Sequence, residues 1–295
     1  MSNIQSVRNN AARASVAGHS DSDANQTKRI TSASDSVTEL SDPLSAQVDV
    51  TSFASFCEDF PLQGEQLYTT LFDRHSDIIQ TQKARFATAN LEKIFKATFE
   101  VSFVSGFDRM SLRDLSRQTG MSMGAIYSCI SKKEDIALMV ADIVRLSSEL
   151  TRQHAMKSAS LWSQIQQSIR FHLYASTLLQ PWYFFLYFET RSLPEDQQEA
   201  SMKIELDAIT GIHTRIEEGI ESGEFKATDA KTIANMIVVL LEDWYLKPWK
   251  TQSGRGANQS LMHQQDQGEK LEKYYQSIIQ MVAKLLAVQT SAETN

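Results

Sequence analysis

Basic side chains that could bind phosphates gather in one short part of this 295-residue chain. Residues 81–133 contain nine Lys and Arg against four Asp and Glu, whereas the whole chain has a formal charge of −7. The 80 residues before them hold five basic and eleven acidic residues, and the 162 residues after them hold fifteen and twenty-one. Because salt screens exposed charges beyond about 8 Å, a polyanion would respond to the local positive charge. This segment is therefore the candidate phosphate-binding surface.

The same segment has the capping signals of two short helices joined by a tight turn. Ser111 is a good N-cap, and Asp114 three residues later can accept from its amide, so a helix is predicted from Leu112. Gly120 can take the left-handed conformation that closes this helix and turns the chain. The stretch from Phe107 to Ile136 is therefore typical of a helix-turn-helix followed at once by a third helix.

A second helix is predicted from Met123 to about Ile130, with Ser122 as its N-cap. Ile126 and Ile130 lie one turn apart and would face the core. Such a helix is about 12 Å long, and the major groove of B-DNA is about 12 Å wide, so its size suits the groove. Its outer face would be small and polar, consisting of Met123, Gly124, Ala125, Tyr127 and Ser128.

The residues from Leu91 through Ile136 resemble the DNA-binding domain of TetR/AcrR-family transcriptional regulators. The resemblance is carried by the segments LEKIFKATFEVSFVSGF, MSLRDLSRQTGMSMGAIY and SKKEDI. Ser128 and Cys129 depart from the family, which usually has aromatic or His residues directly after the tyrosine. The positions that fit the family are Gly106, Leu115, Gly120, Ser122, Gly124, Tyr127 and the pair Lys133-Glu134.

The resemblance implies a set of DNA contacts. Tyr127 matches the family's phosphate-contacting tyrosine, and Arg113 and Met123 match positions that reach base edges, where Arg can pair bidentately with guanine. Lys133 begins the connecting helix, where free amides, the helix dipole and an ammonium would meet one phosphate. A solvated Arg113 and a surface Tyr127 are the alternatives. The expected DNA-binding residues are Ser111, Arg113, Ser122, Met123, Gly124, Ala125, Tyr127, Lys132 and Lys133.

Composition and helical periodicity predict an all-α protein, and the resemblance implies an N-terminal three-helix helix-turn-helix domain and a C-terminal helical ligand-binding and dimerisation domain. The chain is 42% hydrophobic, has only 11 Gly and 5 Pro, and contains long segments with the 3.6-residue period. Its two cysteines, Cys57 and Cys129, make no disulfide framework, which suits a reducing cytoplasm. We find no signal peptide and no apolar run near the ~20 residues of a membrane helix.

Four parts of the chain are predicted. Residues 1–52 form a disordered tail, because the first fifty hold thirteen Ser and Thr and no aromatic residue. Residues 53–80 form a helical N-terminal extension of one or two short helices. The helix-turn-helix domain covers residues 81–135, and the effector-binding and dimerisation domain covers residues 136–290. A helix that begins near Lys132 connects these two domains, and the last domain ends, after a polar loop to Gly268, with a helix from Glu269 to about Val288.

An aromatic cluster after Pro181 has two interpretations. It can be ordinary core packing and dimer contact, or it can wall a pocket with apolar surface and phenols that orient a ligand. The segment that begins FETRSLPEDQQ is similar to family members that sense fatty acyl-CoA, so an amphiphilic or acyl-CoA-like effector is expected, with its polar end near Arg191. The expected pocket residues are Phe171, Tyr174, Phe184, Tyr187 and Trp244.

The sequence thus predicts a ligand-responsive transcriptional repressor that binds a palindromic operator as a homodimer and is released by a small molecule. The segments 229–246 and 269–288 carry broad apolar stripes, and the resemblance implies that they form a four-helix bundle across a twofold axis. The alternative is a helical protein-interaction module that has lost DNA binding. No metal-ligand spacing, nucleotide loop or nucleophile motif is present, so no metal, no cofactor and no enzymatic activity are expected.

Overall fold

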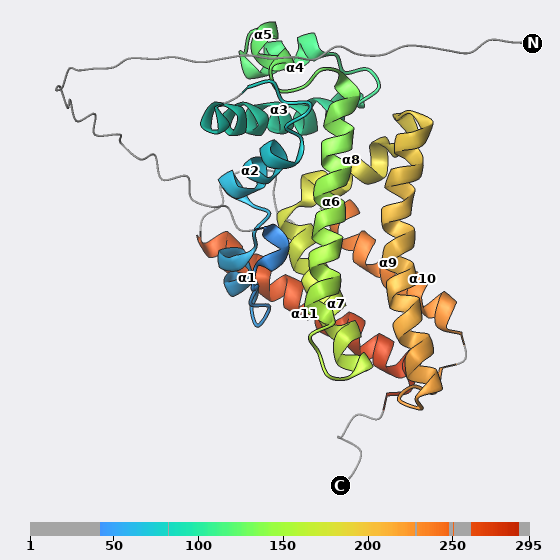
Figure 1. The fold of residues 1–295 in the computed structure, drawn as a ribbon. Helices are drawn as coiled ribbons and strands as arrows, with labels where there is room; N and C mark the ends of the chain where they lie inside the picture. The colour runs from blue at the N-terminus through green and yellow to red at the C-terminus, as the bar shows by residue number, and fades with distance from the viewer. Residues whose placement is uncertain (1–41, 82, 228, 248–249, 251–260, 289–295) are drawn as a thin grey trace, which may run out of the picture. The chain divides into compact units, whose positions relative to one another are not determined.

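The computed structural model describes residues 42–81, 83–227, 229–247, 250 and 261–288. These residues form α-helices joined by short loops, with no strand among them, and the predicted all-α class is confirmed (Figure 1). Short 3₁₀ helices cover Pro43–Ser45 (η1) and Thr190–Ser192 (η2). The α-helices are α1 (Phe53–Asp59), α2 (Gly64–Arg74), α3 (Ala84–Ser105), α4 (Leu112–Thr119), α5 (Met123–Tyr127), α6 (Lys133–Ala155), α7 (Leu161–Leu178), α8 (Gln180–Glu189), α9 (Glu195–Glu221), α10 (Ala230–Leu246) and α11 (Leu261–Leu286).

Helices α3, α4 and α5 lie together at one end of the long helix α6, which runs from them along the body of the protein (Figure 1). The body consists of α7 to α11, and α6 packs against α7, α8 and α9. The core is continuous between the two regions, because the buried residues Ile94, Leu115 and Ile126 of the three-helix head belong to the same cluster as Ile143 and Ile169. Among the described residues, no helix is long and apolar enough to cross a membrane.

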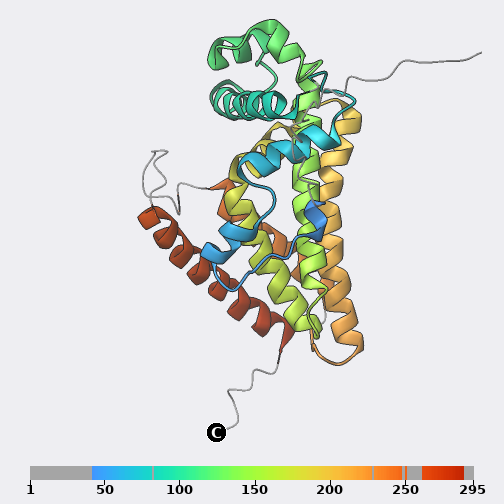
Figure 2. The same cartoon turned by 60° about the vertical axis from the view of Figure 1, so that its left-hand side comes forward.

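The predicted N-terminal extension folds as two short helices, α1 and α2, and its helical character is confirmed. Figure 2 shows it lying between α3 and α11 along one side of α6, and α2 packs on α3 while α1 packs on α7 and α11. Phe56 of α1 is fully buried, with its ring 5.1 Å from that of Phe171. The extension is therefore part of the hydrophobic core.

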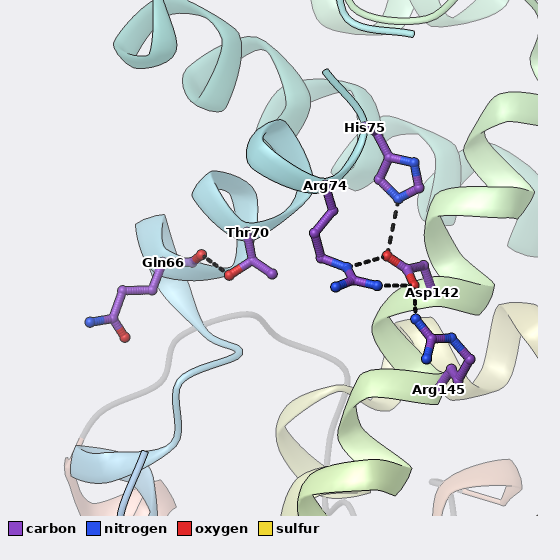
Figure 3. A network of polar contacts seen from close by, with 6 residues as sticks. All are labelled: Gln66, Thr70, Arg74, His75, Asp142 and Arg145. Carbon is purple, nitrogen blue, oxygen red and sulfur yellow. Dashed lines mark hydrogen bonds and ion pairs between the residues drawn. The ribbon is translucent and has the colours of Figure 1, made fainter. Parts of the chain in front are cut away.

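Hydrogen bonds and ion pairs join the end of α2 to the middle of α6 (Figure 3). Arg74 donates to both carboxylate oxygens of Asp142, at 2.6 and 2.8 Å. Arg145 donates to the same carboxylate at 2.6 Å, and His75 Nε2 lies 3.2 Å from it. Burial raises the pKa of Asp142, but the contacts with His75, Arg74 and Arg145 outweigh burial and hold that pKa well below its usual range. The carboxylate stays charged and joins two elements distant in sequence.

Two predicted boundaries need correction. The predicted disordered tail reached residue 52, but residues 42–52 include η1, and Val48 and Val50 are buried; residues 1–41 lie outside the described part of the chain. The last helix begins at Leu261, ahead of the predicted Glu269. Gly268, predicted to end a loop, lies inside α11, where a Cβ would come within 3.5 Å of Phe53 Cβ. That distance is an ordinary van der Waals contact, so the packing of α1 does not by itself require glycine there.

Candidate nucleic-acid interface and internal cavity

Capping side chains and a left-handed glycine fix the geometry of α4 and α5. Ser111 and Asp114 form the predicted capping box, with Ser111 N donating to Asp114 Oδ2 at 2.9 Å, and α4 begins at Leu112 as expected. Gly120 closes α4 with φ 69° and ψ 8°, values that cost an L side chain energy. Ser122 Oγ accepts from Ala125 N at 3.2 Å and starts α5. The turn between the two helices is therefore set by local hydrogen bonds.

The outer face of the two helices matches the predicted DNA-binding face in part. Arg113 and Gly124 are exposed, and Tyr127 is 47% exposed, while Met123 and Ala125 are half-buried. No hydrogen bond or ion pair joins Arg113 to another of the described residues, whereas the neighbouring Arg117 pairs with Asp114 of its own helix. The structure thus presents a guanidinium, a tyrosine and a small residue on one surface, and a base or phosphate could approach them.

Lys133 lies differently from what the sequence suggests. Its ammonium donates to the carbonyl oxygens of Phe107 and Asp108, at 3.1 and 2.9 Å, and lies 5.0 Å from the centre of the Phe107 ring. The ammonium expected to bind a phosphate is therefore used inside the protein, where it holds the loop before α4 against α6. Lys132 is exposed and is the better placed cation at this helix start.

The end of α5 is anchored by a segment whose role the sequence did not reveal. The predicted helix continued to about Ile130, but α5 ends at Tyr127, and Ser128 O accepts from the amides of Gln80 and Thr81 at 3.0 and 3.2 Å. Cys129 is fully buried beside it, and burial raises the pKa of its thiol. A chain segment that runs from the N-terminal extension into the helix-turn-helix domain therefore packs against the two residues that depart from the family pattern.

A cavity of about 460 Å³ lies between α6, α7, α8, α9 and α10. This volume falls within the roughly 300–1,000 Å³ of small-molecule sites. Apolar and aromatic side chains share its wall with polar ones, so a ligand would meet both kinds of surface. The lining includes Val144, Arg145, Ser148, Glu149, Arg152, His172, Tyr183, Leu186, Tyr187, Ser201, Glu205, Ile212, Arg215, Leu241, Glu242 and Tyr245.

Of the five expected pocket residues, only Tyr187 lines this cavity. Phe171 and Tyr174 point to the other side of α7, where their rings lie 5.1 and 5.3 Å from that of Phe56. Phe184 packs on Phe188, with ring centres 4.4 Å apart. Helical spacing placed these side chains on faces of α7 and α8 but could not show which face the extension covers.

Trp244 also lies outside the cavity. Its indole Nε1 donates to Thr177 Oγ1 at 2.8 Å, and its ring lies 5.0 Å from that of Tyr274 on α11. The cavity is instead lined by Leu241, one turn earlier on the same helix, and by the adjacent Tyr245. Arg191, expected at the rim, is exposed and is not among the residues that line the cavity.

Comparison with known proteins gives the class of the fold. No family model and no curated protein matches the chain. A TetR-family regulatory protein from Rhodococcus RHA1 is 17% identical and superposes with a TM-score of 0.52 over 65% of this chain and 96% of its own. A TetR-family regulator from Streptomyces coelicolor A3 is 13% identical, with a TM-score of 0.53 over 65% and 90% of the two chains.

A third structure, AibR in complex with isovaleryl coenzyme A and operator DNA, is 11% identical with a TM-score of 0.50 over 68% of this chain and the whole of its own. At such identities the likeness shows the fold alone. The described residues have the fold of TetR-family transcriptional regulators, with an N-terminal helix-turn-helix and a helical C-terminal domain. The resemblance that the sequence suggested is therefore confirmed at the level of the fold.

Proposed function

We propose that this protein is a transcriptional regulator that binds double-stranded DNA through α4 and α5 and responds to a small molecule in the cavity beside α6. The observation that carries the proposal is the combination of an exposed, basic helix-turn-helix face with a partly open cavity in one continuous core. Eight cations of residues 81–133 are exposed in the described structure, namely Lys83, Arg85, Lys93, Lys96, Arg109, Arg113, Arg117 and Lys132. Their local field favours a phosphate backbone.

The geometry supports a direct coupling between cavity and head. Phe107, in the loop before α4, receives three contacts from cavity-forming helices: its amide donates to Glu189 Oε2 at 3.0 Å, its carbonyl accepts from Lys133, and its ring lies 5.0 Å from that of Phe185. Glu189 and Phe185 belong to α8, which also lines the cavity through Tyr183, Leu186 and Tyr187. A ligand that shifts α6 or α8 would therefore move the loop that leads into α4.

We further propose that the protein acts as a homodimer on a palindromic operator, and as a repressor. Exposed apolar side chains on the last two helices support this, with Met236 43% and Val239 61% exposed on α10 and Met281 and Leu285 each 38% exposed on α11. Two recognition helices held about 34 Å apart would enter successive major grooves. A ligand that favours another spacing would release the DNA by its differential affinity for the two states.

The dimer is tested by placing charge on this exposed stripe. Val239→Glu and Met281→Glu should yield folded monomers in sedimentation, because neither side chain is buried in the monomer. These variants should bind operator poorly, because each monomer then binds its half-site separately and the gain in effective concentration within a dimer is lost. Dimers that persist in both variants would place the interface elsewhere.

The DNA-binding function is tested by selecting duplexes from a random-sequence library and titrating the best one in an electrophoretic mobility shift. A regulator should select a palindrome. Affinity should also fall linearly on a log-log plot against salt, because counterions are released from the phosphates. Failure to select any sequence, with only weak and sequence-independent retention, would instead support a helical interaction module that has lost DNA binding.

A further inference from the structure

Some charged side chains of the cavity wall have no ion-pair partner among the described residues. The wall carries three arginines and four carboxylates, Arg145, Arg152, Arg215, Glu149, Glu205, Asp207 and Glu242. Arg145 shares the carboxylate of Asp142 with Arg74, each at 2.6 Å, and Arg152 pairs with Glu149 at 2.5 Å. Asp207 pairs with Lys203 of its own helix at 2.9 Å. Three charged side chains of the wall remain without an ion-pair partner among the described residues, namely Arg215, Glu205 and Glu242.

Arg215 is satisfied by neutral acceptors. It donates to Gly211 O at 2.7 Å and to Gln164 Oε1 at 3.3 Å, and burial lowers the pKa of its guanidinium. Glu205 and Glu242 have no such partner, because no hydrogen bond or ion pair joins either carboxylate to another described residue. Burial, with the charge of Glu205 nearby, raises the pKa of Glu242 to about 7. The wall therefore has two carboxylates without an ion-pair partner, a half-buried one at Glu242 and an exposed one at Glu205, and a cation could pair with them.

Aromatic rings line the cavity together with these two carboxylates. The rings of Tyr183 and Tyr245 are 5.1 Å apart, and that of His172 lies 5.4 and 6.2 Å from them. Burial raises the pKa of Tyr245, and the charges of Glu242 and Glu205 add to that shift. Burial lowers the pKa of His172 to about 4, so its neutral imidazole supplies no positive charge at pH 7. Aromatic faces attract organic cations.

Two buried polar atoms of the wall also lack a partner in the described structure. Ser201 is only 6% exposed and its Oγ has no hydrogen bond, and the buried Nε2 of His172 has none either. Native proteins leave few buried polar atoms unsatisfied, and such atoms often mark a place that something else occupies. Both residues line the cavity, so a bound molecule would be their nearest source of a partner.

We propose that the ligand of this cavity is a lipophilic organic cation, whose charge lies beside Glu242 and Glu205 and whose apolar body lies against Tyr183, Tyr187 and Tyr245. The proposal rests on the proposed function, because it names the chemical class of the effector at the same site. It also departs from the acyl-CoA class that the sequence suggested. The phosphates of coenzyme A could pair with Arg215 on this wall, but they would also meet four carboxylates, two of them without a cation.

The test uses two probes of the same shape and opposite charge, tetraphenylphosphonium and tetraphenylborate, with isovaleryl-CoA as a third. Calorimetric titration of the full-length protein should give at least tenfold tighter binding of the phosphonium than of the borate. Glu242→Gln should weaken phosphonium binding by tenfold or more and leave borate binding equal or stronger. Glu221→Gln is the matched control, since Glu221 lies exposed at the end of α9 and does not line the cavity.

Three results would overturn the ligand class: no phosphonium binding, preference for the borate or the CoA ester, or an unchanged phosphonium affinity in Glu242→Gln. Glu205→Gln is a second variant for the same test, in case Glu242→Gln does not fold. A thermal unfolding curve of each variant shows whether it is folded. Mobility shifts on the selected duplex separate the two proposals. Phosphonium that binds through Glu242 but leaves DNA bound would contradict the regulatory role and keep the ligand class, whereas DNA binding without phosphonium binding would contradict the ligand class alone.

Discussion

The helix-turn-helix and the cavity are assembled in opposite ways. Between residues 111 and 127 the helix starts and the turn are set by side chains at most three residues away, such as the capping box of Ser111 and Asp114, and by the left-handed Gly120. The cavity takes its wall from five helices, and residues as far apart in sequence as Val144 and Tyr245 share it. Local contacts make the first region robust to changes elsewhere, whereas any shift of one helix alters the second.

The largest expected effect is a loss of DNA binding by a variant that keeps its ligand binding. Gly124 lies on the exposed face of α5, where an added Cβ would meet only Ser122 Oγ at 3.9 Å. The midpoint temperature of thermal unfolding of Gly124→Leu should therefore equal or slightly exceed that of the wild type, because leucine favours a helix by up to about 1 kcal/mol over glycine. Its side chain would stand between α5 and the groove floor, so duplex binding should fall by roughly a hundredfold or more.

Ligand binding by Gly124→Leu should match the wild type in calorimetry, since the cavity contains no residue of α5. If this variant binds the selected duplex normally, α5 does not enter the groove and the interface on the head has to be placed elsewhere.

Arg113→Ala should have the next largest effect and should test whether the head distinguishes bases. The exposed guanidinium can pair bidentately with a guanine, so its removal should cost about 1 to 3 kcal/mol at one position of each half-site and little on random DNA. Competition between operator variants in mobility shifts measures this. An equal loss on every variant would show that Arg113 only attracts phosphates.

The two lysines at the start of α6 should behave differently. Lys132→Ala should lower the magnitude of the log-log salt slope by about 0.9 for each phosphate that its ammonium neutralises in the wild-type complex. Lys133→Met removes an ammonium that already donates to two carbonyls, and should leave that slope unchanged while costing about 1 to 3 kcal/mol of unfolding free energy. Salt titrations and denaturant unfolding of both variants decide this. A reduced slope for Lys133→Met would mean that its ammonium reaches DNA after all.

The smallest expected effect lies in the cavity and depends on pH. The raised pKa of Glu242, about 7 against an ordinary 4.5, means that the folded state favours the protonated acid. The contribution of Glu242 to stability is therefore present below its unfolded pKa and is lost as pH rises through its folded value. Glu242→Gln should gain stability relative to the wild type between about pH 5 and pH 8.

The comparison is made between variants because His172 contributes the opposite slope at lower pH. Its pKa is lowered to about 4 by burial, so its contribution to stability rises as pH increases toward the ordinary value of 6.5. Thermal unfolding of both proteins in matched buffers measures the difference. A constant gap across this range would show that Glu242 is not buried as a neutral acid.

The sequence by itself determined the head. Ser111, Gly120 and Ser122 act on the next few residues of the chain, so their types and spacing predict α4, the turn and the start of α5. Helical periodicity likewise predicted the extension and the long helices of the body, and only ends such as that of α11 were misplaced. Arg113 and Tyr127 could be singled out through the family resemblance, and the exposure of Tyr127 also follows from the position of the buried Ile126 beside it.

Only the tertiary structure decided which faces of the body helices look inward to a cavity and which pack on a neighbour. Phe171 and Tyr174 have the spacing of pocket residues, yet α1 covers them, while His172 on the intervening face lines the cavity. The same holds for Lys133, because its ammonium donates to the carbonyl of Asp108 in a loop 25 residues earlier. Periodicity gives the direction of a side chain around its own helix, but the identity of its neighbour depends on contacts between segments far apart in the chain.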